Sequence, residues 1–279
     1  MAVYGNTLSN NIIAIDYVLQ EGNQLLKLFD SIQCLNENGI ILEAEEKAPT
    51  FLKVVGERIV NFLTKLKNAI ASFFSKIKQK VRSAIGPSSK VTIADLEVID
   101  VKGYVDKWNA IDDKYKLADD IKRLSKGTHT LYKDEMEKAI EENAQPAIKE
   151  VEELLDSMKE PEVVTIANKK ASDILNELDS LNIKKVLNSI NNTITNCHSL
   201  TVGSTMIQKA EKAEGSVNSF FNGGTYDKMR EYFAAVAKYY TISSNVWKEI
   251  QQDVTKVYAA VVQYVKSNKG GSKPAEETK

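Results

Sequence analysis

Apolar residues recur at steps of three and four along most of this chain, which is the period of an α-helix. The pattern is sharpest from Phe51 to Ile85 and from Tyr226 to Tyr264. In the first segment the apolar positions form one stripe, which predicts a single helix about 50 Å long. The stripe consists of Leu52, Val55, Ile59, Phe62, Leu66, Ala69, Phe73, Ile77, Val81 and Ile85.

The charged positions of the same segment are almost all cationic, and we call them the basic face. The basic face consists of Lys53, Arg58, Lys65, Lys67, Lys76, Lys78, Lys80 and Arg82. Glu57 is the single acid, so eight cations less one acid give the segment +7, and the rest of the chain carries −8 of the net −1. This helix is therefore suited to an apolar partner on one side and a polyanion on the other.

Three interpretations of this helix remain open. It can be a packing helix whose stripe joins a bundle and whose lysines face water. It can lie on an anionic membrane surface, because four phenylalanines lie on one side with lysines on the other, namely Phe51, Phe62, Phe73 and Phe74. It can also contact nucleic acid. The basic face holds six lysines, two arginines and no aromatic residue, so such contact would reach phosphates without reading bases.

Breaks in the pattern divide the chain. An acidic cluster lies between Asn38-Gly39 and Pro49, and Gly86-Pro87 ends the basic helix. We therefore expect an N-terminal helix with an acidic linker at residues 1–43, a basic amphipathic helix module at 44–90, a helical bundle at 91–269 and a disordered tail at 270–279.

The fold class predicted for the chain is all-α, an elongated multi-helix bundle with an N-terminal basic amphipathic helix module. Low glycine and proline content, 13 and 5 residues, supports it. Val91–Val101 fits either a short strand or a helix, and we assign a helix because no partner strand can be identified. Further helices are expected at Gly103–Leu124, Leu131–Lys159, Pro161 to about Ser180, Leu181–His198 and Gly203–Phe221.

The C-terminal segment has heptad-like spacing, interrupted only at Ser243. It can form either a core or an assembly seam, and we favour the core because the other helices need a partner. The core positions expected there include Phe233, Val236, Tyr240, Trp247, Ile250 and Val254.

The sequence offers no catalytic constellation. His129 and His198 are the only histidines, and no nucleotide-binding or nucleophile motif is present. Cys197 and His198 are adjacent on a helix, so their side chains diverge and cannot share a proton. Cys34 and Cys197 form no disulfide framework. The chain also lacks a secretory signal pattern and a long apolar run. We expect a non-enzymatic protein without cofactor, metal or small-molecule substrate.

The stretch ILEAEEKAPTFLKVVGERIVNFLTKLKNAIASFFSKIKQKV resembles internal virion proteins of large tailed bacteriophages. In that group a prohead protease cleaves after a glutamate preceded by Leu or Ile two positions earlier and followed by a small residue. Ile41-Leu42-Glu43 followed by Ala44 fits, so the resemblance implies processing between Glu43 and Ala44. Leu19-Gln20-Glu21 followed by Gly22 fits as well. The core of the pattern is also matched by Leu35-Asn36-Glu37 and Leu175-Asn176-Glu177.

The resemblance implies a phage virion structural protein, made in the host cytoplasm and located inside the head or ejected with the genome. Its partners would be other virion proteins or further copies of itself, with non-specific phosphate contact to nucleic acid or an anionic membrane surface. The alternative is a cytosolic or toxin-like helical protein that docks on a membrane or a partner helix through residues 51–85.

Overall fold

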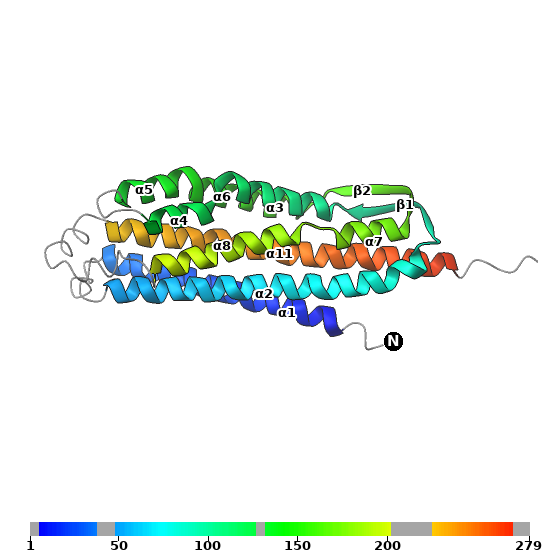
Figure 1. The fold of residues 1–279 in the computed structure, drawn as a ribbon, viewed down its shortest axis with the longest axis horizontal. Coiled ribbons are helices and arrows are strands. Elements are labelled where there is room, and N and C mark those ends of the chain that lie inside the picture. The colour runs from blue at the N-terminus through cyan, green and yellow to red at the C-terminus, as the bar shows by residue number, and fades with distance from the viewer. Residues whose placement is uncertain (1–5, 38–47, 127–131, 202–224, 270–279) are drawn as a thin grey trace, which may run out of the picture.

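The computed structural model describes residues 6–37, 48–126, 132–201 and 225–269, and in it the chain forms an elongated bundle of helices (Figure 1). The predicted all-α, multi-helix class is confirmed. Helices α1 and α2 lie along one side of the bundle, α3 to α6 along the opposite side, and α11 runs between them. The helix expected at 203–221 lies outside the described residues.

The elements follow one another along the chain in this order. The helices are α1 (Asn6–Glu37), α2 (Ala48–Ser88), α3 (Val101–Tyr115), α4 (Leu117–Lys126), α5 (Tyr132–Lys138), the π-helix η3 (Ala139–Ala144), α6 (Gln145–Ser157), α7 (Ala171–Asp179), α8 (Ile183–Thr201) and α11 (Thr225–Lys269). The strands are β1 (Thr92–Ile99) and β2 (Val163–Lys170).

Helix α11 is the centre of the core. It packs against α1, α2, α3, α5, α6 and α7. The core positions predicted for it, Phe233 to Val254, are all buried, which confirms that prediction. Trp247 makes edge-to-face contacts with Phe74 of α2 and Trp108 of α3, with centroids 6.2 and 5.5 Å apart. At the interruption in the pattern, Ser243 Oγ accepts a 3.1 Å hydrogen bond from Trp108 Nε1, so this serine satisfies a buried donor.

The apolar stripe of α2 is also part of this core. Ile59, Phe73 and Ile77 are fully buried, and the helix packs against α1, α7, α8 and α11. Burying side chains of this size stabilises the fold by about 1.5 to 3 kcal/mol each. The stripe therefore serves the protein's own bundle.

The helix predicted for Val91–Val101 is wrong, because this segment contains strand β1, which pairs antiparallel with β2 and aligns Leu96 with Ile166. The helix expected from Pro161 is wrong over β2 for the same reason. Both strands are rich in β-branched residues, which suit a half-buried pleated surface. Asn168 has a left-handed φ of 57°, which interrupts the ladder where the Ala94 N–H donates to Tyr264 Oη of α11 at 3.0 Å.

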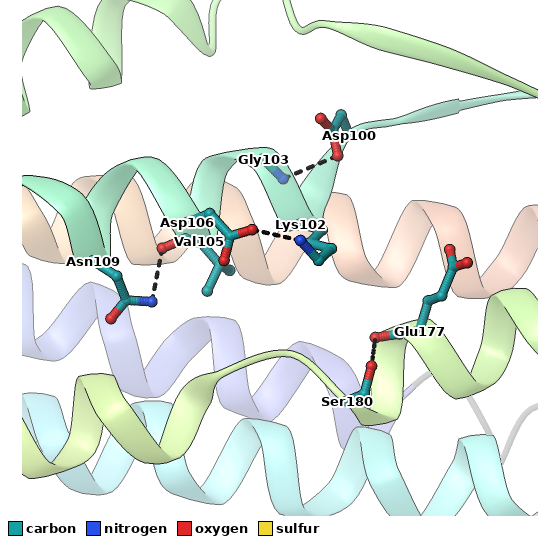
Figure 2. A network of polar contacts seen from close by, with 8 residues as sticks. All are labelled: Asp100, Lys102, Gly103, Val105, Asp106, Asn109, Glu177 and Ser180. Carbon is teal, nitrogen blue, oxygen red and sulfur yellow. Dashed lines mark hydrogen bonds and ion pairs between the residues drawn. The ribbon is translucent and has the colours of Figure 1, made fainter.

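Helix α3 starts directly after β1 (Figure 2). Asp100 Oδ1 accepts a 2.9 Å hydrogen bond from the Gly103 N–H and so caps the helix. A Cβ atom at Gly103 would lie 2.3 Å from Asp100 Oδ2, so this position favours glycine. The helix predicted for Gly103–Leu124 is divided at Lys116, where φ is 48°. The Asp100 N–H donates to the Glu162 carbonyl at 2.9 Å, which brings the two ends of the segment 100–162 together.

Candidate functional site on helix α2

The structure separates the cations of the basic face into two rows along α2. Between the rows, the outermost line of the helix is neutral, polar and exposed. This line consists of Asn61, Asn68, Ser72, Ser75, Gln79 and Ser83. Residues that are four, seven or eleven positions apart lie on the same side of a helix. By this spacing the eight cations form two sets of four, one on each side of the outermost line. Each set therefore lies next to the helices that flank α2.

The first flank consists of Arg58, Lys65, Lys76 and Lys80 and borders α1 and α11. Lys65 forms an ion pair with Glu21 of α1. Both residues line a surface hollow between α1 and α2, and Arg58 lines it as well. Tyr258 Oη of α11 donates to the Lys80 carbonyl at 3.5 Å. Arg58 and Lys65 are exposed, whereas Lys76 and Lys80 are half-buried.

The second flank consists of Lys53, Lys67, Lys78 and Arg82 and borders α8 and α7. Lys67 Nζ donates to Asn191 Oδ1 of α8 at 2.9 Å, and Arg82 Nη2 lies 3.7 Å from Asp179 Oδ2 at the end of α7. Both contacts are at the surface, so they orient the side chains but contribute little to the free energy of unfolding. The second flank is thus partly neutralised by its neighbours.

Three lysines meet in a groove of about 790 Å³ between the C-terminal halves of α2 and α11, which we call the lysine groove. They are Lys76, Lys80 and Lys266, and Ala84 and Val262 provide apolar wall. None of the described residues that line it is acidic. Burial lowers the pKa of the Lys80 ammonium, and the nearby charge of Lys76 lowers it further. This groove is therefore suited to hold an anionic group.

Lys266 is a groove residue that sequence reasoning missed. It lies two residues beyond Tyr264, where the heptad-like pattern ends, and the basic face was defined from residues 51–85 alone. Its four-residue distance from Val262, another groove residue, is the signal that places it on the same side of α11.

The suspected processing residues Glu43 and Ala44 lie outside the described residues. The three other matches to the cleavage pattern lie within helices, with Leu35-Asn36-Glu37 at the end of α1. Leu19 and Glu21 belong to α1, with Leu19 buried and Glu21 paired to Lys65. Leu175 is buried in α7. Helical, buried segments are poor protease sites compared with exposed loops, so the matches at Leu19 and Leu175 are not open to cleavage in the folded chain.

Two side chains of types that can act in catalysis, Cys197 and Asp120, are buried within the fold. Cys197 is fully buried, and burial raises the pKa of its thiol to about 12, so it carries almost no reactive thiolate at neutral pH. Asp120 is buried as well, and its carboxylate accepts a 2.6 Å hydrogen bond from Asn143 Nδ2. Asp120 is therefore held within the fold, although charged residues surround it in the sequence. Among the described residues, no cluster of three metal-binding side chains occurs.

Two further observations bear on the class of protein. No described helix has the length and apolar character required to cross a membrane. Comparisons with known protein families, with curated proteins and with solved structures find no match to this chain.

Proposed function

We propose that this chain is a non-enzymatic structural protein of a phage particle, located inside the head or ejected with the genome, that contacts nucleic-acid phosphates through the lysine groove. The phosphate contact is inferred from the different positions of the apolar and the cationic residues of α2. Its apolar stripe packs inside the bundle, while three lysines meet at the surface beside α11 without an acidic residue among the described lining.

The separation of buried apolar residues from surface lysines argues against docking on a membrane through residues 51–85. An interfacial helix must present apolar side chains and cations to the membrane together. In α2 the phenylalanines Phe62, Phe73 and Phe74 are 2% exposed or less, so they can reach a lipid surface only if the bundle opens. The cations remain accessible, and cations alone provide electrostatic contact with phosphates.

The residue types also fit this contact. Lysine ammonium groups act as point charges and bind phosphates without the bidentate geometry that arginine uses for base and phosphate recognition. Contact through lysines is accordingly independent of base sequence and strongly dependent on salt. A protein that shares a particle with a packaged genome needs this kind of weak, reversible contact.

The phosphate contact is tested by fluorescence anisotropy with a labelled duplex of mixed sequence. We expect the triple variant Lys76→Gln, Lys80→Gln, Lys266→Gln to bind more weakly than wild type and to reduce the slope of log K against log salt by about 3. The matched control is the triple variant Lys102→Gln, Lys149→Gln, Lys159→Gln, which removes equal charge from exposed sites elsewhere. Equal losses in both triple variants would refute a specific role for the groove.

The particle assignment has its own test, mass spectrometry of purified phage particles. We expect peptides of this chain in the particle, with a new N-terminus at Ala44. A chain that still carries residues before Glu43 would refute the processing. Absence of the chain from particles, together with binding of the soluble protein to anionic vesicles, would favour the membrane-docking alternative.

A further inference from the structure

A second cavity, of about 540 Å³, lies on the other side of α11 between α1 and the junction of η3 with α6. We call it the Arg230 cavity. Four apolar side chains, Leu26, Phe29, Ile140 and Ile148, contribute to its wall. Its volume lies within the range of about 300 to 1,000 Å³ that small-molecule sites occupy. The cavity is thus large enough, and apolar enough on one side, to accept a small amphipathic ligand.

Arg230 supplies the polar end of this cavity. Its side chain is only 10% exposed, and its Nη2 lies 3.6 Å from Asp227 Oδ1, a distance too long for a good hydrogen bond. Its Nη1 is buried and has no hydrogen-bond partner among the described residues. Leaving an N–H donor of a buried guanidinium without a hydrogen bond is costly. Arg230 also lines the cavity, so its guanidinium can bind an oxyanion there.

The other charged side chains of the cavity are paired or exposed. Glu152 pairs with Lys238 at 3.2 Å, and Glu231 pairs with Lys228 at 3.0 Å. Lys149, a further lining cation, lies 3.9 Å from Glu153, and its side chain is 77% exposed. Asp30 is an exposed lining residue. These acids repel a highly charged anion, so the cavity favours a ligand with a single negative charge.

One wall of the cavity is formed by the π-helix η3. The Gln145 N–H bonds to the Ile140 carbonyl, which is the i to i−5 pattern, and both residues line the cavity. Such widened turns are uncommon, and they occur frequently at functional sites. The helical backbone is therefore irregular where it forms the wall of the Arg230 cavity.

We propose that the Arg230 cavity binds an amphipathic monocarboxylate, whose carboxylate accepts hydrogen bonds from the Arg230 guanidinium and whose apolar chain lies against Phe29, Ile140 and Ile148. This site is independent of the lysine groove and of the contact with nucleic acid. Guanidinium groups are well suited to carboxylates because two N–H donors match the two oxygens.

Decanoate is a suitable probe, used on the full chain by calorimetric titration and thermal melting. We expect decanoate to bind and to raise the melting temperature of the wild type through preferential binding to the folded state. Decanol lacks the charge and acetate lacks the chain, so both should bind at least tenfold more weakly. Equal binding of decanol and decanoate, or no binding of decanoate, would overturn the proposal.

Two variants locate the site, and one serves as control. Arg230→Met should reduce decanoate affinity about 10- to 100-fold. Its ligand-free melting temperature should equal or exceed that of the wild type, because a buried N–H donor without a hydrogen-bond partner has been removed. Ala235→Leu keeps the arginine but fills the cavity, and it should also abolish binding. Arg82→Met removes an exposed arginine on α2 and should bind like the wild type. Retained decanoate affinity in both Arg230→Met and Ala235→Leu would refute this site.

Discussion

Helices α2 and α11 are the two longest in the described part of the chain, and both carry an apolar stripe at helical spacing, yet their surroundings differ. Between Val55 and Val81, eight residues of α2 are exposed. Between Met229 and Val257 of α11 only three are exposed, Glu231, Lys238 and Lys256. Helix α2 therefore covers the bundle from one side, whereas α11 is enclosed by it.

The enclosed helix carries a group of buried polar residues, Thr241, Ser243, Ser244, Gln251 and Asp253. Two buried hydrogen bonds between side chains join α11 to other helices. Ser243 accepts from Trp108, and Tyr240 Oη lies 2.7 Å from Thr193 Oγ1. A strongly amphipathic pattern thus marks a covering helix, and a stripe with polar interruptions marks the central one.

The largest expected effect is at the centre of α11. Trp247→Ala removes a fully buried indole that contacts Phe74 and Trp108, so we expect a loss of about 3 to 5 kcal/mol in the free energy of unfolding, measured by chemical denaturation. Lys248→Ala is the control. Lys248 pairs with Asp16 at 2.8 Å, and its loss should cost under about 1 kcal/mol. Unchanged unfolding of Trp247→Ala together with loss of self-association would identify the stripe as an assembly seam.

Helix α2 should respond more weakly but in the same cooperative transition. Ile70 is fully buried in α2, and Ile70→Ala should cost about 2 to 4 kcal/mol through the cavity that it leaves. Because α2 packs on four helices, we expect circular dichroism and tryptophan fluorescence to report one coincident unfolding transition. A separate early transition in this variant would show that α2 is an independent module.

A smaller effect on stability is expected when the same substitution, serine to alanine, is made in α11 and in α2. Ser243→Ala leaves the Trp108 Nε1 donor unpaired inside the core and should cost about 1 to 3 kcal/mol. Ser72→Ala, at an exposed position on the outer line of α2, should change stability by less than about 0.5 kcal/mol. Similar values from thermal melting of the two variants would contradict the distinction between the central and the covering helix.

The smallest effect is expected on the first flank. Lys65→Gln removes an ion pair with Glu21 in which the lysine side chain is 52% exposed, so its cost should be below about 1 kcal/mol. The difference from wild type should shrink further in high salt, because exposed charges are screened. A loss that is large and independent of salt would mean that Lys65 has a structural role in joining α1 to α2.

Most helices of this fold were predictable because their signal is local. The stripe of α2 and the core positions of α11 follow from spacing alone. The core positions of α11 are buried as predicted, and for α2 the structure selects the packing interpretation, with Val55 to Val81 of the stripe buried. The sheet was not predictable in the same way, because each strand depends on a partner far away in sequence. The β-branched run from Val163 to Ile166 was a usable signal for β2, but Pro161 was interpreted as the start of a helix.

The candidate site was only partly predictable for a related reason. Composition identified the cations of α2, but their division into two flanks depends on where α1, α8 and α11 lie. Arg230 was missed because the apolar stripe passes through its neighbour Met229. Apolar residues follow Arg230 at helical spacing, three, four and seven positions later, at Phe233, Ala234 and Ala237. This spacing is the sequence signal that could have indicated a buried arginine.

The pairing of β1 with β2 also has a consequence for the kinetics of folding. The strands align Ile99 with Val163, as in a hairpin, but helices α3 to α6 lie between them in the chain. Closing a long flexible loop costs about 0.6 kcal/mol for each doubling of its length, and such non-local contacts slow folding. Helices α3 and α6 pack against each other, and we expect this contact to form first, since it shortens the effective loop between the strands. The sheet would then form late, and its amide protons would gain protection after those of α3 and α6.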